Sequence, residues 1–360
     1  MMKKKGLCLL VTLVCVVHSI PTFDRKRGKS NNFRLIEQLS DQDDRSFSEK
    51  LKMFDEWLNA NNASVKSLEV KEQIRDGKTQ RGTFMTHDVK DIDDPIMVIP
   101  RRAMICGADA LAKLLELAGN DTNTRQDLND MHQLDEKLSI AAFIADRMTI
   151  SCNVSPKGVC DEKNDLNRNF DPYFDIMPSI DNLEHLPINW NDDELRRLRG
   201  LDLRDTVIRR LARVFQYFRT LKIDGILRES TTFDAFRAAY SNVMARAFGL
   251  YTTDSGSTPC MVPYGDLLNS ADGGSYNIAW SFERAYNGFV MRANSKLKHG
   301  TEVFDTYGAS KQPELFVFLY GFIPDALLPK KFQNGKRDES LKYTDVLQFV
   351  HSKGGAGYSA

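Results

Sequence analysis

Apolar residues recur along this chain with two periodicities, one typical of helices and one typical of strands, and the changes from one to the other divide the sequence. The first part opens with a helical pattern over residues 47–58, whose apolar face carries Phe47, Leu51, Phe54, Trp57 and Leu58. Strand-like runs follow at 65–70, 82–85 and 96–100, the last of which ends at a proline. The pattern predicts one helix that leads into small sheets.

The middle of the chain, residues 108–248, is predicted to be almost entirely helical apart from a polar loop over 151–168. Its strongest helical patterns cover residues 108–118, 135–148 and 205–221. The outer face of the third helix carries Arg209, Arg210, Arg213 and Arg219. We interpret this basic face as solvated surface, and docking of an acidic partner is the alternative.

Strand patterns return after Met261. Short runs bounded by turns lie at 280–282, 288–293 and 302–306, and a helix is predicted over 313–320. The order of strands, helices and strands predicts an α+β fold, in which a β-rich domain is interrupted by a helical insertion. A chain of 360 residues with 42% apolar residues is long enough to bury such a core.

The N-terminus has the features of a secretory signal peptide. Three lysines precede the twelve-residue apolar segment from Gly6 to Val17, and a cleavable site follows at Val17-His18-Ser19. Twelve residues are too few for a membrane-spanning helix, which needs about 20. We therefore expect residues 1–19 to be removed, which leaves no stable membrane span, and the protein to enter the endoplasmic reticulum lumen or be secreted. An uncleaved short anchor is the alternative.

The two ends of the mature chain are polar. Residues 20–45 are predicted to form a flexible leader, and residues 326–360 a polar tail. Loss of the signal segment leaves 46 basic against 49 acidic residues, a net charge of −3, which does not favour nucleic-acid binding. The spacing of the cysteines and histidines does not suit zinc, so no metal site is expected. The oligomeric state is not indicated by any pattern.

Four cysteines remain after cleavage, and they are Cys106, Cys152, Cys160 and Cys260. In an oxidising lumen Cys152 and Cys160 can close a short surface loop, which leaves Cys106 with Cys260 as the other available pair. Free buried thiols are the alternative. Three sequons, which begin at Asn62, Asn120 and Asn153, are glycan acceptors in the same compartment. They are compatible with secretion and do not by themselves establish it.

The most specific pattern lies in the last third of the chain. Residues 261–270 are MVPYGDLLNS, and about thirty residues later residues 299–308 are HGTEVFDTYG. Glu314-Leu315 and Tyr320-Gly321-Phe322 follow them. Upstream segments belong to the same series: residues 82–89 (GTFMTHDV), 99–101 (IPR), 171–178 (DPYFDIMP), 186–190 (LPINW), 194–195 (EL) and 243–248 (VMARAF).

In order, spacing and most residue types, these segments resemble the signature of SET-domain methyltransferases, in the branch that includes the Rubisco large-subunit and actin-histidine methyltransferases. The resemblance covers roughly residues 65 to 325. It implies a β-rich fold of small twisted sheets with a knot-like C-terminal threading, formed by residues 46–107 and 236–325, with residues 108–235 as the helical insertion. It also implies transfer of a methyl group from S-adenosylmethionine to lysine, or less favourably histidine, of a protein substrate.

The resemblance further implies which residues hold the cofactor. Arg246 would contact its carboxylate end, since a planar guanidinium makes paired hydrogen bonds. Asn269 and the backbone at Ser270 would hold the amino-acid and adenine parts. Asp266 would brace that loop from behind. Gly82 would let the opening hairpin come close to the cofactor, which a Cβ would obstruct.

Tyr307 is the residue that the resemblance places at the methyl-transfer channel. It would contact the cofactor, and its phenol would orient the nucleophile and favour the transferring methyl electrostatically. Phe289, Tyr264 and Trp280 are candidate walls of the channel, and plain core packing is the alternative for each. His87 and His299 are interpreted as surface residues.

Four departures from the family pattern bear on catalysis. Gln80 stands where the family has the first glycine of its opening turn, and Ser270 stands where it has histidine. Gln312, followed by a proline, replaces an asparagine, and only 38 residues follow Phe322, where relatives usually continue into a helical substrate-docking domain. A second class of function therefore stays open, namely a secreted SET-fold binding or matrix protein without catalysis.

Overall fold

The computed structural model describes residues 45–327 except 66, 76–77, 146–167, 254–255, 272–274, 309 and 325–326. The predicted signal peptide, nearly all of the leader and tail, and the loop with Cys152, Cys160 and Asn153 lie outside the described residues. Within the described ranges, no helix has both the length and the apolar character needed to cross a bilayer.

Helix α3, Phe47–Ala60, has the amphipathic character that the sequence predicts. Its first turn is held by a capping box, in which the Ser46 hydroxyl accepts from the Glu49 amide and the Glu49 carboxylate accepts from the Ser46 amide. Phe54 and Leu58 are fully buried on its inner face. The helix therefore packs as one layer behind the sheets.

Strands β1, Leu68–Arg75, and β2, Lys78–Met85, form an antiparallel hairpin. The hairpin is longer than the two runs predicted at 65–70 and 82–85. Its outer half carries polar residues such as Glu72 and Arg81, which pair across the strands. These residues break the apolar alternation, so hydrophobicity alone did not reveal the full strands.

Three further small sheets complete the β-rich part of the described chain. Strand β9 (Gly288–Ala293) lies between β3 (Met97–Pro100) and β8 (Ile278–Glu283), and β6 (Gly256–Met261) lies between β4 (Ile105–Cys106) and β5 (Phe248–Thr253). These pairings are antiparallel, whereas β7 (Asn269–Ser270) and β10 (Phe304–Asp305) pair in parallel. Two sheets join strands from before and after the insertion, so the two ends of the domain form one unit.

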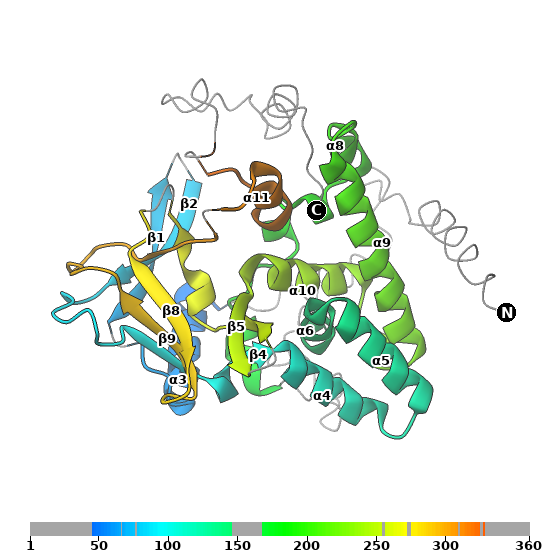
Figure 1. Ribbon diagram of the computed structural model, residues 1–360, viewed down its shortest axis with the longest axis horizontal. Helices are drawn as coiled ribbons and strands as arrows, with labels where there is room; N and C mark the ends of the chain where they lie inside the picture. Colours follow the sequence, from blue (N-terminus) through cyan, green and yellow to red (C-terminus); the bar gives the residue numbers. More distant parts are fainter. Residues whose placement is uncertain are drawn as a thin grey trace.

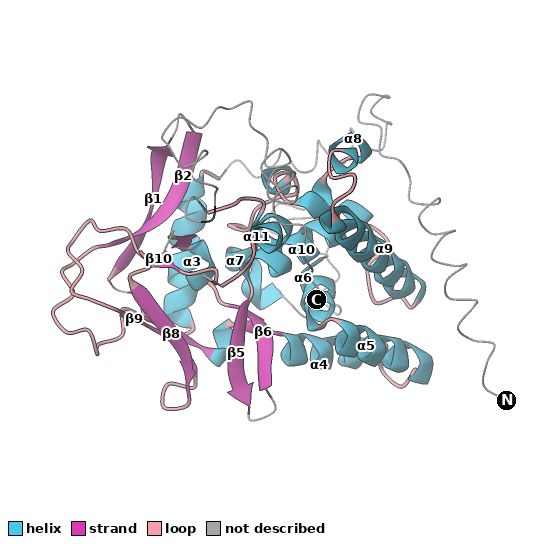
Figure 2. Ribbon diagram, turned by 45° about the horizontal axis from the view of Figure 1, so that its top comes forward, coloured by secondary structure: helices cyan, strands magenta, loops and turns pink. Residues whose placement is uncertain are grey.

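The helical insertion is built around α6, Glu136–Ala145, in which every residue from Leu138 to Ala145 is buried. The surrounding helices are α4 (Gly107–Ala118), α5 (Thr122–Leu134), α7 (Asp171–Phe174), α8 (Asp192–Arg196), α9 (Asp202–Ile223) and α10 (Phe233–Arg246). Helix α5 lies in the region predicted to be mostly helical, but its bounds were not predicted, because its sequence is mostly polar. Figures 1 and 2 show the sheets on one side of the molecule and this group of helices on the other.

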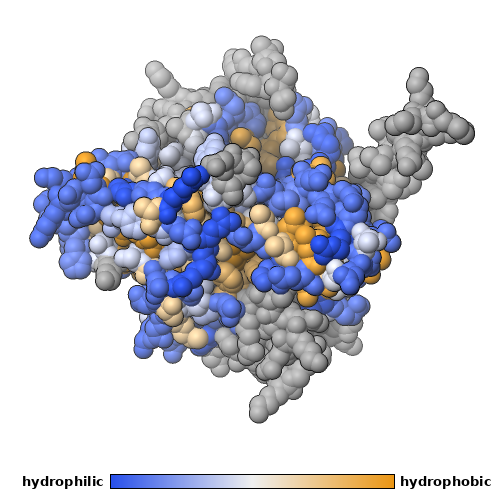
Figure 3. Space-filling model, turned by 60° about the horizontal axis from the view of Figure 1, so that its bottom comes forward, coloured by the Kyte–Doolittle hydropathy of each residue, from blue (hydrophilic) through white to orange (hydrophobic). Residues whose placement is uncertain are grey.

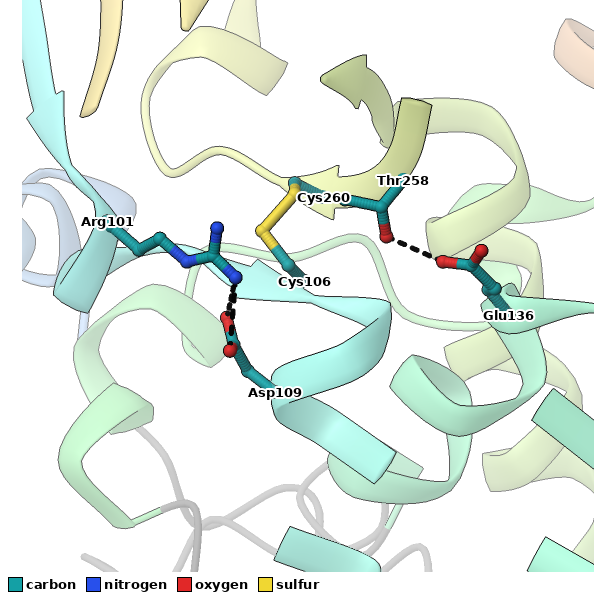
Figure 4. The surroundings of a disulfide bond; sticks show 6 residues. All are labelled: Arg101, Cys106, Asp109, Glu136, Thr258 and Cys260. Atoms are coloured by element: carbon teal, nitrogen blue, oxygen red, sulfur yellow. Dashed lines mark hydrogen bonds and ion pairs between the residues drawn. A yellow bond between two sulfur atoms is a disulfide. The ribbon is translucent and has the colours of Figure 1, made fainter. Parts of the chain in front are cut away.

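A disulfide joins Cys106 to Cys260, which are paired residues of neighbouring strands β4 and β6 and lie 154 residues apart in the sequence. It stands where the insertion leaves the β-rich part, beside the Arg101–Asp109 ion pair (Figure 4). Both cysteines are fully buried. The second of the two predicted pairs is thus confirmed, and the free-thiol interpretation is wrong for these two residues.

The basic face of α9 is only partly a solvated surface. Arg209 and Arg219 are exposed as predicted. For Arg210 the prediction of a solvated side chain is wrong, because its Nη1 lies 2.7 Å from the Asp135 carboxylate and also donates to the Tyr240 hydroxyl. His87 and His299 are exposed, which confirms their interpretation. On the face shown in Figure 3 the surface is mostly hydrophilic, with hydrophobic side chains in separate areas.

Candidate functional site

The segments around Asn269 and Tyr307 meet in space. Their strands β7 and β10 run side by side, with Asn269 opposite Phe304 and Ser270 opposite Asp305. Just beyond β10, the Tyr307 amide donates to the Ser270 hydroxyl over 3.3 Å. The segment before it also bonds to β2, since the Val303 amide donates to the Thr83 carbonyl. Residues 303–307 therefore thread between the opening hairpin and the β7 segment, as the resemblance implies.

Tyr307 lies in an aromatic group with the C-terminal motif. Its ring centroid is 4.6 Å from that of Tyr320 and 6.4 Å from that of Phe322. Tyr320 ends helix α11, Pro313–Tyr320, and Gly321 follows with φ +74°. A Cβ at Gly321 would lie 2.6 Å from the His185 carbonyl oxygen, so this sharp turn requires glycine.

Burial keeps the phenols of this group protonated. It raises the pKa of Tyr307 well above its ordinary value and that of Tyr320 to about 12. A phenol in this state does not act as a general base at neutral pH. It can still donate and accept hydrogen bonds, which is the orienting role predicted for Tyr307.

Arg246, Asp266 and Tyr173 form a connected polar group at the end of α10. The Arg246 Nε lies 3.0 Å from Asp266 Oδ2, and the Tyr173 hydroxyl donates to the same oxygen over 2.7 Å. The side chain of Asp266 is fully buried, whereas that of Arg246 is 20% exposed. Asp266 therefore does more than brace its loop from behind, because it directly holds Arg246.

The free edge of Arg246 fits a carboxylate. Among the contacts of the described residues, only its Nε has a hydrogen-bond partner. The two terminal nitrogens are left to bind an anionic group from outside, and a planar fork is suited to a carboxylate. The arginine also acts electrostatically on the Tyr307 phenol, whose pKa it lowers against the larger effect of burial. Arg246 and Tyr307 are thus near enough to interact electrostatically.

Asn269 and Gly82 come together through Glu302, a residue that the sequence analysis did not single out. The Asn269 side-chain amide donates to Glu302 Oε1 over 2.9 Å and to the Arg81 carbonyl over 2.8 Å. A Cβ at Gly82 would lie 2.5 Å from that same Glu302 oxygen. In this structure the atom nearest to a Cβ at position 82 therefore belongs to the side-chain carboxylate of Glu302.

Two of the three candidate channel walls belong to the core. Phe289 is fully buried and packs against Phe248 and Trp280, and Tyr264 is 2% exposed and stacks on Phe54. Trp280 is partly buried and donates from Nε1 to Asp305, two residues before Tyr307. The rings that contact Tyr307 come instead from the Tyr320-Gly321-Phe322 motif.

Lys311 is a further residue that the sequence analysis passed over. Its ammonium donates to the Tyr307 carbonyl and lies 6.0 Å from the centroid of the Tyr320 ring. Gly308, with φ +104°, leaves room for the Lys311 side chain, because a Cβ at position 308 would collide with it. A positive charge therefore stands beside the aromatic group. Within the described residues no cluster of metal-ligating side chains is present.

The architecture matches solved structures. The SET domain of LSMT bound to methyllysine and AdoHcy aligns with a TM-score of 0.55 at 20% identity, over 86% of this chain and 65% of that one. The same domain bound to lysine and AdoHcy aligns with a TM-score of 0.54 at 20% identity, over 78% of this chain and 58% of that one. The chain has the SET fold. The predicted α+β class, with small sheets and a helical insertion, is confirmed.

Sequence comparison connects the same SET fold to curated proteins. No family model matches the chain. N-lysine methyltransferase SETD6 of Rattus norvegicus is 27% identical over 164 residues, which are 42% of this chain and 33% of the rat protein. The Homo sapiens protein of that name is 26% identical over 165 residues, 42% of this chain and 34% of its own length. The matched part thus spans about a third of these relatives.

Proposed function

We propose that this SET-fold chain is an S-adenosylmethionine-dependent protein N-methyltransferase that acts on lysine. The observation that carries the proposal is that one segment of a SET fold, residues 266–270, holds Arg246 through Asp266, contains Asn269 and lies against Tyr307. The similar curated proteins are named N-lysine methyltransferases, which supports lysine over histidine.

The residues present suit the cofactor. The free edge of Arg246 would hold its carboxylate, while Asn269 and the backbone at Ser270 would line the rest of the site, with Gly82 and Glu302 beside Asn269. S-adenosylmethionine supplies an electrophilic methyl group on a sulfonium. Bound there, it would donate this methyl group to the neutral lysine amine, which would then release a proton to solvent.

The protein's own contribution is alignment and exclusion of water. The neutral Tyr307 phenol orients the substrate amine, and the rings of Tyr320 and Phe322 cover one side of that tyrosine. The amine must be uncharged to attack, and burial favours its neutral form. Lys311 acts in the same direction, because a nearby ammonium disfavours a second one.

Calorimetric titration with S-adenosylmethionine tests the proposal. The full chain, produced by secretion, should bind the cofactor saturably and should incorporate methyl groups into lysines of a protein extract. Absence of binding at millimolar cofactor would contradict the enzyme and favour the non-catalytic SET-fold protein. Methylation confined to histidine would overturn the choice of lysine.

We further propose that the chain works in the secretory pathway. The signal-like N-terminus supports this, and so does the Cys106–Cys260 disulfide, since structural disulfides persist in oxidising compartments. The sequon residues Asn62 and Asn120 are both exposed, as glycan acceptors must be. Peptide mapping of the secreted protein without reductant should find the linked cysteine peptides and a mass shift on glycosidase treatment. A protein retained in the cytosol with free thiols would refute the assignment.

A further inference from the structure

One residue of the helical insertion, Tyr173, reaches the residues that are proposed to bind the cofactor. Tyr173 lies on α7 and is fully buried, with its ring stacked on Phe54 at a centroid distance of 5.9 Å. Its hydroxyl donates to Asp266 Oδ2 over 2.7 Å. The ring is therefore fixed by packing, and the hydroxyl is the part that interacts with the site.

Arg246 and Tyr173 share one oxygen of the Asp266 carboxylate. The other oxygen, Oδ1, is buried and has no hydrogen-bond partner within the described structure. A carboxylate held on one side only can rotate when one of its two donors is lost. The direction of the Arg246 guanidinium, which depends on Asp266, would then be less well defined.

The hydroxyl of Tyr173 is a dependable donor. Burial raises its pKa well above the ordinary value, and the neighbouring Asp266 charge raises it further. The proton therefore stays on the phenol across the physiological range, and the shared oxygen always has its second donor.

We infer that Tyr173 is a positioning residue, which holds Arg246 through Asp266 in the orientation that binds the cofactor carboxylate. The inference rests on the proposed function and deepens it, because it makes cofactor affinity depend on the folded helical insertion. Tyr173 does not touch the reacting atoms. Its effect should appear in cofactor binding and much less in the chemical step.

The chain contains a matched control for this role. Tyr240 is also fully buried, and its hydroxyl donates to Asp135 Oδ2 over 2.8 Å. An arginine, Arg210, lies 2.7 Å from that same oxygen. Tyr240→Phe therefore removes a tyrosine–aspartate bond from a similar triad, together with the bond that Arg210 donates to its hydroxyl, and this triad contains neither Asp266 nor Arg246.

The test compares Tyr173→Phe with Tyr240→Phe in the full chain. Titration with S-adenosylmethionine should show about a tenfold higher Kd for Tyr173→Phe, the loss expected when one hydrogen bond to a charged group is removed. The Kd of Tyr240→Phe should stay within about twofold of the wild-type value, while its Tm should fall by about as much as the Tm of Tyr173→Phe. In turnover assays, Tyr173→Phe should raise KM for the cofactor more than it lowers kcat.

A double variant separates positioning from general loosening. If Tyr173 acts through Arg246, adding Tyr173→Phe to Arg246→Lys should change Kd by less than about threefold. Asp266→Asn, which removes the charge that holds both donors, should weaken binding at least as much as Tyr173→Phe. This variant also serves where Tyr173→Phe folds poorly.

The possible outcomes are distinct. Wild-type binding together with an unchanged Kd in Tyr173→Phe or in Asp266→Asn overturns the inference and leaves the proposed function standing. Equal losses of affinity in Tyr173→Phe and Tyr240→Phe also overturn it, because the effect would then be one of stability. No cofactor binding by wild type overturns the proposed function and the inference with it.

Discussion

The Tyr307 hydroxyl donates a hydrogen bond to the backbone carbonyl of Leu268, 2.8 Å away, across 39 positions of sequence. Leu268 lies two residues after Asp266 and directly before Asn269. The bond therefore joins the tyrosine proposed for catalysis to the loop that holds Arg246. The candidate catalytic and cofactor-binding residues form one connected unit.

Tyr307→Phe removes that hydroxyl and leaves the ring among Tyr320 and Phe322. We expect methyl transfer to fall about 100-fold, the cost typical of one lost electrostatic contact at a reacting centre. Cofactor affinity should stay within about threefold, since the phenol is not the carboxylate site. Radiolabelled methyl incorporation and calorimetry measure the two effects. Tyr286→Phe, at an exposed tyrosine, is the control, and equal activity of both variants would remove Tyr307 from the mechanism.

Arg246→Ala should weaken S-adenosylmethionine binding about 10- to 100-fold, because paired hydrogen bonds to a carboxylate are lost. It should also lower stability, since the fully buried Asp266 side chain loses its countercharge. Arg209→Ala, at an exposed arginine of α9, should change neither quantity. Titration calorimetry and thermal unfolding check both effects. Wild-type affinity in Arg246→Ala would show that the carboxylate binds elsewhere.

The Cys106–Cys260 bond closes a loop that contains the whole helical insertion. Chain-entropy arguments give a stabilisation of about 5 kcal/mol for a loop of this length. The double variant Cys106→Ala/Cys260→Ala should therefore lose several kcal/mol of unfolding free energy in urea titrations. Under strong reductant, the unfolding free energy of wild type should approach that of the variant. Identical urea midpoints for the oxidised wild type and the variant would contradict a structural role.

Gly82→Ala places a methyl group against Glu302, whose Oε1 lies 2.5 Å from the ideal Cβ position. We expect a loss of about 1–3 kcal/mol in unfolding free energy, the usual cost of overpacking. Adding Glu302→Ala should restore part of that loss, because it removes the colliding atoms. Urea unfolding of the two single variants and the double variant measures this coupling. If the free-energy losses of the two single variants simply add in the double variant, the collision is not the cause of the loss in Gly82→Ala.

Asp305 gives a pH-dependent prediction. Burial raises its pKa in the folded state, so the carboxylate costs stability wherever it is ionised. Stability from this residue is present below the ordinary aspartate pKa of about 4 and is lost as pH rises through the raised folded pKa. Asp305→Asn, whose amide oxygen can still accept from Trp280, should raise Tm by about 2 °C at pH 7. The gain should vanish below about pH 4, and a gain that persists there would refute the explanation.

Much of this fold could be predicted from local pattern. Helix α11 was predicted at its observed bounds, because Pro313 suits a first helical turn and glycine follows Tyr320. The long helix α9 was predicted at 205–221 and spans Asp202–Ile223, since a strong apolar stripe fixes the helix better than its ends. The bounds of polar elements could not be predicted in this way. Helix α5, inside the region predicted to be mostly helical, and the outer half of the β1–β2 hairpin carry too few apolar residues for periodicity to define their ends.

The sequence by itself determined the SET-type order of segments, the candidate residues and the possible cysteine pairs, because these depend on residue type and spacing along the chain. Only the tertiary structure decided that Asp266 holds both Arg246 and Tyr173, that Glu302 faces Gly82, and that Tyr320 rather than Phe289 contacts Tyr307. Such contacts join residues tens to hundreds of positions apart. They depend on how strands and helices cross, which no local pattern records.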